Sequence, residues 1–270
     1  MALAAARSCR ASCDRRLIRR NGSVTPRRFL CYEAWPGPFG GELPLAHAVD
    51  LPSEPDLGTV FPPYRPIHEF PGPYVDAGQA EIAAWPVEGG LIRAAVQGFL
   101  RPADALALYE LAWFAPGDVL ELGSAWGLSA GILCRAMRNR NRPGTAVSIE
   151  IDPGFQRLTK ESVAAAGLQR WHDMQGGDAG PLLARLAAAR RQFGFVFIDH
   201  DHGYAAVRVV CDLLPGILPP GGYALFHDFN DSRNRTGEYG VYRAVAEMTA
   251  GAAMRFAGVI GCCALVQKTG

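Results

Sequence analysis

The chain has 270 residues, of which 49% are hydrophobic and 20% charged, and its formal net charge is +1. Such a composition is typical of a globular protein that forms one large domain and an additional segment. The near-neutral charge does not favour nucleic acid or an anionic membrane as a partner. No apolar run is long enough to span a bilayer, so we do not expect a membrane protein.

The cysteines predict free thiols. Their number is odd and their spacing is scattered, which matches neither a disulfide framework nor the ligand pairs of a zinc site. Cys134 and Cys211 lie in apolar helical patterns, where buried thiols are common. Free thiols persist in a reducing compartment, and the expected location is therefore the cytoplasm. The seven cysteines are Cys9, Cys13, Cys31, Cys134, Cys211, Cys262 and Cys263.

The start of the chain is strongly basic. Residues 1–28 contain eight arginines and a single acid, Asp14. An Arg-rich start can belong to a transit peptide, a nucleic-acid arm or a disordered tail, whereas the apolar run "MALAAA" is too short for a secretory signal. We expect a disordered tail, or an extension that results from a misassigned start codon.

Residues 29–86 are rich in proline and glycine. The stretches "WPGPFGGELP", "FPPYRP" and "FPGPY" lie between Pro36 and Pro73. Proline breaks helices and removes ladder hydrogen bonds, so this region cannot hold long helices or central strands. We expect an irregular arm that wraps the main domain with aromatic anchors. Such an arm can also line a substrate pocket.

Residues 87–270 show regular periodicity, which begins with two expected amphipathic helices, "EGGLIRAAVQGFL" (88–100) and "PADALALYELAWF" (102–114). Strands and helices then alternate, which predicts an α/β domain whose parallel sheet has helices on both faces. The last two strands are too close together for a helical crossover and should form an antiparallel hairpin. The expected strands are 118–123, 146–152, 170–178, 193–199, 221–229, 253–259 and 261–268, and the later helices are 127–139, 153–167, 179–192, 204–217 and 240–250.

A glycine-containing turn follows the first of these strands, in "VLELGSAWGLSAG". Gly123 allows a sharp turn and the close approach of a ligand, and Gly127 allows the next helix to begin beside it. The Gly-x-x-x-Gly spacing is not the dinucleotide fingerprint, and no lysine follows as in a P-loop. Glu121 precedes the turn, where it would repel a pyrophosphate but would suit a ligand with an ammonium group.

Two further acids end the next two strands. Glu150 in "VSIEID" can accept hydrogen bonds from the hydroxyls of a ribose, and Asp178 in "QGGDA" can accept one from an adenine amino group. Each acid alone could equally cap a helix or lie in a solvated loop. An ammonium, a ribose and an adenine together describe S-adenosylmethionine, so three acids at consecutive strand ends favour a site for this cofactor.

The order of the motifs "LELGSAWGLS", "SIEID", "GGDA", "VFIDHDHGY" and "LPPGGYALFHD" resembles class I S-adenosylmethionine-dependent methyltransferases. The pattern "IDxxHxY…LxPGGxxxxHD" is similar to the small-molecule O-methyltransferase group of that class. The resemblance covers residues 91–268 and implies a Rossmann-like seven-stranded sheet that ends in an antiparallel hairpin. It also implies cofactor contacts at Glu121, Gly123, Ser124, Gly127, Ser129, Glu150 and Asp178.

Asp199 and Asp228 follow the fourth and fifth strands, which should be neighbours. Two carboxylates there can share a divalent cation such as Mg²⁺, which would bind a substrate hydroxyl and lower its pKa. The resemblance implies the same site, because metal-dependent relatives place an acid at Asp199 and acids or amides at the end of the next strand. Relatives often carry a second acid or Asn where this chain has His227 or Phe229, so His227 or Asn230 is the expected third ligand.

The expected catalytic residues are Asp199, Asp201 and His202. His202 lies three residues after Asp199 and has a near-neutral ordinary pKa, so it is the preferred general base, with Asp201 as the second candidate. Both could instead cap the next helix, and this simpler role is the one we expect for His200. The substrate pocket should come from the Pro-rich arm, the two leading helices and the loop at 230–240.

The function that these patterns favour is methylation of an oxygen on a small hydroxylated metabolite or natural product by direct transfer. Metal-assisted deprotonation is the first expected route, and a metal-free site with His202 as the base is the second. An NAD(P)-dependent oxidoreductase is an alternative, but Glu121, the turn spacing and the closing hairpin disfavour it. A non-catalytic S-adenosylmethionine-binding protein would not need Asp199, His202 and Asp228. A nucleic-acid methyltransferase lacks support beyond the basic start. A homo-oligomer that exchanges its arms is also compatible with the sequence.

Overall fold

The computed structural model describes residues 50–270. The basic segment 1–28 and the beginning of the Pro-rich arm lie outside the described residues, so the predictions made for them stay predictions. Within residues 50–270, the helices are too short or too polar to cross a membrane.

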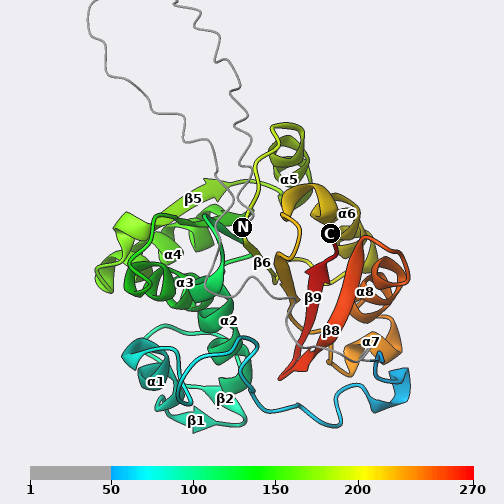
Figure 1. Cartoon of the computed structure of the whole chain (residues 1–270), viewed down its shortest axis with the longest axis horizontal. Helices are drawn as coiled ribbons and strands as arrows, with labels where there is room; N and C mark the ends of the chain where they lie inside the picture. Colours follow the sequence, from blue (N-terminus) through cyan, green and yellow to red (C-terminus); the bar gives the residue numbers. More distant parts are fainter. Residues whose placement is uncertain (1–49) are drawn as a thin grey trace, which may run out of the picture. The chain divides into compact units, whose positions relative to one another are not determined.

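The centre of the described chain is a seven-stranded mixed sheet, as predicted. Its strands are β3 (Val119–Leu122), β4 (Ala146–Glu150), β5 (His172–Gly176), β6 (Phe195–Ile198), β7 (Tyr223–Phe226), β8 (Met254–Ile260) and β9 (Cys263–Lys268). The order across the sheet is β5-β4-β3-β6-β7-β9-β8 (Figure 1). Strands β3 to β7 pair in parallel, whereas β9 is antiparallel to both β7 and β8. The predicted closing hairpin is confirmed.

Helices cover both faces of this sheet. They are α2 (Pro102–Phe114), α3 (Leu128–Asn139), α4 (Pro153–Ala165), α5 (Ala179–Ala188), α6 (Tyr204–Ile217) and α8 (Val241–Thr249). Alternate residues of β6 enter two cores: Phe195 and Phe197 pack with α2 and α3, whereas Val196 and Ile198 pack with α5, α6 and α8. Both faces of the central strands are therefore buried, which explains their continuous apolar sequence.

The helix predicted at 88–100 is wrong. This segment begins instead with a hairpin of β1 (Val87–Glu88) and β2 (Leu91–Ile92), and the rest of it has no regular structure. Gly89 and Gly90 form its two-residue turn with φ angles of 60° and 80°. Paired positive φ angles are typical of tight hairpin turns and disrupt a helix. The glycine pair therefore outweighs the helical spacing of the apolar residues that follow it.

The helix predicted at 102–114 is present as α2, but it is not amphipathic. Residues 103–112 are all buried, because the sheet, α3 and the short helix α1 (Ala77–Ala83) surround it. In Figure 1, α1, β1 and β2 lie together beside α2. Two of the buried residues of α2 are acids, Asp104 and Glu110. A buried carboxylate requires partners, so both positions mark specific contacts.

Glu110 holds the Pro-rich segment against α2. Its carboxylate accepts hydrogen bonds from the Tyr64 hydroxyl (2.6 Å) and from the backbone N–H groups of Ile67 (2.8 Å) and His68 (2.6 Å). The Gln79 side chain donates to the Tyr64 hydroxyl and to the Leu106 carbonyl, which links the same segment to α2. One buried acid thus satisfies backbone donors of a segment whose prolines prevent ladder pairing.

We predict that Glu110→Ala lowers the free energy of unfolding by about 2–4 kcal/mol, because it leaves several partly buried donors without an acceptor. Urea denaturation measures this loss, and limited proteolysis should become faster between residues 61 and 75. Glu81→Ala is the matched control, because the Glu81 side chain is 60% exposed and, among residues 50–270, forms an ion pair only with Arg135. Its expected cost is below about 1 kcal/mol. Equal losses in the two variants would contradict this role of Glu110.

Candidate functional site

A cavity of about 1170 Å³ lies at the carboxyl ends of the parallel strands. The chain leaves β3 toward β4 on one side and returns to β6 on the other, so the cavity lies at the switch point where open α/β sheets bind ligands. Glu121 and Gly127 do not line it. The predicted site residues that do line it are Gly123, Ser124, Ser129, Glu150, Asp178, Asp199, Asp201, His202, His227 and Asp228.

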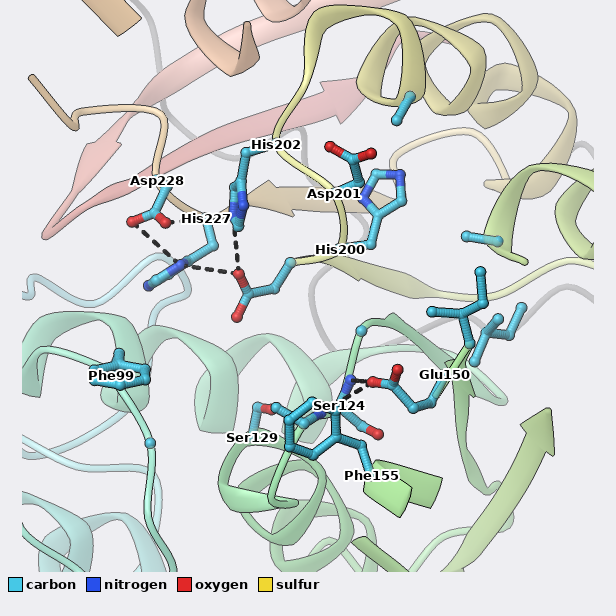
Figure 2. A pocket seen from close by; sticks show the side chains of 18 of the residues that line it. Phe99, Ser124, Ser129, Glu150, Phe155, His200, Asp201, His202, His227 and Asp228 are labelled. Atoms are coloured by element: carbon cyan, nitrogen blue, oxygen red, sulfur yellow. Dashed lines mark hydrogen bonds and ion pairs between the residues drawn. The ribbon is translucent and has the colours of Figure 1, made fainter. Parts of the chain in front are cut away.

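Glycine is required at position 123 in the turn after β3. Gly123 has a φ of +83°, and a Cβ there would lie 2.2 Å from the carbonyl oxygen of Asp199. The turn is then fixed by Glu150, whose Oε2 accepts hydrogen bonds from the backbone N–H groups of Ser124 (3.0 Å) and Ala125 (3.1 Å). Figure 2 shows Glu150 beside Ser124 in the pocket. The end of β4 therefore positions the turn that follows β3.

Glu121 lies behind this turn and not in the cavity. Leu120 and Leu122 face the α5 and α6 side of the sheet, so the alternation of strand residues sends Glu121 to the other face. Its carboxylate is fully buried and accepts a hydrogen bond from the Ser148 hydroxyl at 2.5 Å. Burial raises the pKa of Glu121 to about 7, although hydrogen bonds from Ser129 and Ser148 oppose the shift. A direct contact between Glu121 and a ligand stays a prediction.

Asp178 caps α5, where its side chain accepts a hydrogen bond from the backbone N–H of Gly180 at 3.0 Å. It also lines the cavity, so the capping role and the predicted ligand contact are compatible. Asp201 accepts a hydrogen bond from the backbone N–H of Gly203 (2.7 Å), but Gly203 itself is the N-cap of α6, and no side chain from residue 50 onward caps this helix, so the capping role considered for Asp201 and His200 is wrong. His200 also lines the cavity, and burial lowers its pKa.

Two carboxylates and two imidazoles converge on the opposite side of the cavity. One ligand atom from each of Asp199, His202, His227 and Asp228 lies within 4.8 Å of all the others. The His202 Nε2 is 3.3 Å from an oxygen of each carboxylate, and the His227 Nδ1 is 3.1 Å from Asp199 and 3.5 Å from Asp228. Figure 2 shows His202, His227 and Asp228 pointing toward one another. The structure thus brings the predicted base and the predicted metal ligands together.

The charges of this cluster stabilise one another. Burial alone would raise the pKa of Asp199, but His227 and His202 hold it below its usual range. Burial alone would lower the pKa of His227, but Asp199, Asp104 and Asp228 raise it well above its ordinary value. Neither ring nitrogen of His227 makes a well-oriented hydrogen bond to any residue from 50 onward. The cluster therefore has the charge and the free donor atoms that a divalent cation needs.

The residues after β7 take different roles. Asp228 has a φ of 53°, an uncommon conformation for a residue with a side chain and one that often occurs at functional sites. Asn230 is turned away from the cluster, because its amide accepts from the backbone N–H of Gly58 and donates to the Val60 carbonyl. Phe229 is fully buried in the core. Of the two expected third ligands, only His227 lies with Asp199 and Asp228.

His202 is held by the loop that contains α7 (Arg233–Thr236). Its ring stacks on Tyr239 with centroids 4.5 Å apart, and the Arg233 guanidinium lies 4.0 Å from the centre of the same Tyr239 ring. Arg233 also forms a two-pronged ion pair with Asp231. The predicted loop at 230–240 therefore borders the cavity and restricts the orientation of the His202 ring.

Phe99 and Phe155 also line the cavity, and the sequence did not predict them there. Trp126 contacts Phe99 and Phe155 edge to face, at centroid distances of 5.7 Å and 5.2 Å. Phe99 is 58% exposed although it is large and apolar. Because a helix was predicted at 88–100, the position of Phe99 at the cavity was not expected. Gly98 is the available signal, because a Cβ there would lie 2.3 Å from the Leu128 side chain and the segment must pass close to α3.

Residues 120–229 match the family model described as "Methyltransferase domain". Similar solved structures include the O-methyltransferase from Bacillus cereus in complex with SAH, at 18% identity over 72% of this chain and 91% of that chain, with a TM-score of 0.52. Another is the O-methyltransferase TomG from Streptomyces achromogenes, involved in tomaymycin synthesis, in complex with SAM, at 18% identity over 72% and 91%, with a TM-score of 0.54. At this identity the two structures show the shared fold. The resemblance to class I methyltransferases is confirmed.

We predict that Glu121 makes stability fall as the pH rises. The pKa is about 7 in the folded protein against an ordinary 4.5, so the folded state binds more protons than the unfolded state between these values. At about 1.4 kcal/mol per pKa unit, the loss is on the order of 3 kcal/mol and is complete above pH 7. Urea denaturation of the wild type and Glu121→Gln at pH 5 and pH 8 measures it. Between pH 5 and pH 8, the free energy of unfolding should fall more in the wild type than in Glu121→Gln. Equal changes in the two proteins would contradict the prediction.

Proposed function

We propose that the protein transfers a methyl group from S-adenosylmethionine to an oxygen atom of a small hydroxylated metabolite or natural product. The observation that carries this proposal is the position of the Asp199–His202–His227–Asp228 cluster, which faces the Gly123 turn across one cavity within a methyltransferase domain. One side of the cavity suits the cofactor, and the other side has the groups that bind and deprotonate a hydroxyl. Neighbours with this fold contain SAM or SAH.

The cofactor side fits S-adenosylmethionine through its acceptors. A carboxylate has about four acceptor sites, and Glu150 uses three of them for the backbone N–H groups of Ser124, Ala125 and Asp152. The remaining acceptor site can bind a ribose hydroxyl. Gly123 leaves the turn without a side chain where the ligand passes. The antiparallel β9 and the absence of a dinucleotide fingerprint disfavour the NAD(P)-dependent alternative.

Asp199, His227 and Asp228 are the residues that would hold a divalent cation. Carboxylate oxygens suit Mg²⁺ or Mn²⁺, and the imidazole of His227 extends the choice to other transition metals. Such a cation would lower the pKa of a substrate hydroxyl bound to it. The charge of the cluster and the position of the His227 Nδ1, 3.1 Å from Asp199, are consistent with this proposal.

His202 is the proposed general base. Its side chain is 22% exposed whereas that of His227 is 6% exposed, so His202 can reach a substrate proton. The stack on Tyr239 orients the ring, and the nearby carboxylates of Asp199 and Asp228 would stabilise the imidazolium that forms. In the proposed transfer, Nε2 of His202 would accept the substrate O–H proton, the oxygen would form a bond to the methyl carbon, and the bond from that carbon to the sulfonium sulfur would break. The second product is S-adenosylhomocysteine.

The proposal extends to the organisation and location of the chain. We place the methyltransferase domain at residues 87–270, with the Pro-rich arm as a separate element that covers α2. The described cysteines are buried free thiols, which supports a reducing compartment such as the cytoplasm. The Asp199–His202–His227–Asp228 cluster disfavours the alternative of a non-catalytic protein that only binds S-adenosylmethionine.

We predict that S-adenosylhomocysteine binds the wild type in titration calorimetry and that Gly123→Ala reduces the affinity at least about tenfold. The added Cβ would overlap the Asp199 carbonyl and strain a left-handed residue. Gly131→Ala is the matched control, because a Cβ at this position in α3 meets no described neighbour within 4 Å. It should leave the affinity unchanged. If the wild type binds NADH and not S-adenosylhomocysteine, the proposed function is wrong.

We predict that Mg²⁺ or Mn²⁺ produces binding heat in the wild type and none in Asp199→Ala. His202→Ala should keep the binding heat but lose about 10²–10⁴-fold in methyl transfer to hydroxylated acceptors, as expected for removal of a general base. The transfer is followed with a labelled methyl group. If His202→Ala also abolishes cation binding, His202 is a metal ligand and the base must be sought elsewhere.

A further inference from the structure

Asp104 lies in the first turn of α2, outside the residues that match the family model and outside every motif found in the sequence. Its side chain is fully buried. A carboxylate in such a position is costly unless charged or hydrogen-bonded partners compensate for the loss of water. The partners of Asp104 therefore indicate why an acid occupies this position.

Two neutral partners fix the carboxylate. One oxygen, Oδ2, accepts a hydrogen bond from the backbone N–H of Arg101 at 2.8 Å, and the other, Oδ1, accepts one from the backbone N–H of Cys262 at 2.9 Å. The turn between β8 and β9 fits closely around it, since a Cβ at Gly261 would lie 2.1 Å from Oδ1. These contacts join the start of α2 to the end of the sheet and leave little freedom for the side chain.

The charged partner of Asp104 is His227. The His227 Nε2 lies 3.7 Å from Oδ2 of Asp104, whereas Nδ1 on the other side of the ring lies 3.1 Å from Asp199 and 3.5 Å from Asp228. The ring also packs edge to face on Phe197. Its two nitrogens therefore face different carboxylates, and only Nδ1 faces the cluster that lines the cavity.

We propose that Asp104 is a positioning residue that directs Nδ1 of His227 to the cation. The carboxylate favours a proton on Nε2, which leaves the lone pair of Nδ1 free for a metal ion. Histidine ligands of metals commonly have such an acidic or carbonyl partner behind the ring, which fixes the ring orientation and the tautomer. This inference rests on the proposed function, because it concerns the cation that Asp199, His227 and Asp228 would hold.

A purely structural role is the alternative, since Asp104 also ties Arg101 to Cys262. A double-mutant cycle separates the two roles, because groups that act through each other show non-additive effects. The probe is Mn²⁺ alone, and its affinity is measured by calorimetry in the wild type, Asp104→Asn, His227→Asn and the double variant. Asp104→Asn should bind Mn²⁺ about 10–100-fold more weakly than the wild type. In the His227→Asn background, the same change should cause no further loss.

Cys263→Ala is the matched control. The Cys263 thiol approaches the other oxygen of Asp104, Oδ1, at 3.6 Å and is buried in the same turn. Its removal disturbs the packing around Asp104 but leaves the contact with His227, so Mn²⁺ affinity should stay within about twofold of the wild type. Thermal melting and S-adenosylhomocysteine affinity verify that each variant is folded.

Three results would overturn the inference. Unchanged Mn²⁺ affinity in Asp104→Asn would show that Asp104 does not act on the metal site, although the proposed binding of a cation by Asp199, His227 and Asp228 would be retained. If the losses of Mn²⁺ affinity in the two single variants multiply in the double variant, Asp104 acts independently of His227 and has only a structural role. A wild type that binds S-adenosylhomocysteine but no divalent cation would overturn both this inference and the metal-assisted mechanism. If Asp104→Asn does not fold, ¹⁵N spectra of histidine in the Zn²⁺-loaded wild type decide, and a metal on Nε2 of His227 would contradict the proposal.

Discussion

The site depends on the contact between the end of β6 and the glycine turn that follows β3. Only a residue without a Cβ can occupy position 123, because the Asp199 carbonyl lies where that atom would be. The parallel pairing of β3 with β6 then places the Asp199 side chain on the far side of the same cavity. Glu150 completes the arrangement by binding the turn from β4. Three adjacent strands thus fix the separation between the two halves of the site.

Burying several ionisable groups together has a cost that their mutual pairing must offset. A buried ion pair often contributes little net stability, whereas the removal of one partner is expensive. His227 lies among Asp104, Asp199 and Asp228, and this surrounding negative charge overcomes the effect of burial on its pKa. The cluster is therefore better explained by a function than by a contribution to stability. The left-handed conformation of Asp228 supports the same conclusion.

The sequence was informative where one physical rule dominated. Alternation of apolar strands and helices predicted the sheet. The rule that ligands bind at the carboxyl ends of parallel strands placed most of the predicted site residues correctly at one cavity. The prediction of a helix at 88–100 was wrong, because Gly89 and Gly90 form a hairpin turn despite the helical spacing of the apolar residues that follow. Asp104 could not be found, because its contacts with Cys262 and His227 join residues far apart in the chain. Such pairs depend on packing that no local pattern encodes.

The side of the cavity where we propose that the substrate binds is built from the least patterned parts of the chain. Phe99 comes from the irregular segment after β2, and Tyr239 comes from the loop around α7. The Pro-rich segment is attached close by, because Asn230 binds Gly58 and Val60 and the Gly261 N–H donates to the Pro62 carbonyl. Phe99 and the Pro-rich segment lie outside residues 120–229, which match the methyltransferase family. In the proposed function, the shared domain would carry out the methyl transfer, and the choice of acceptor would depend largely on elements outside residues 120–229.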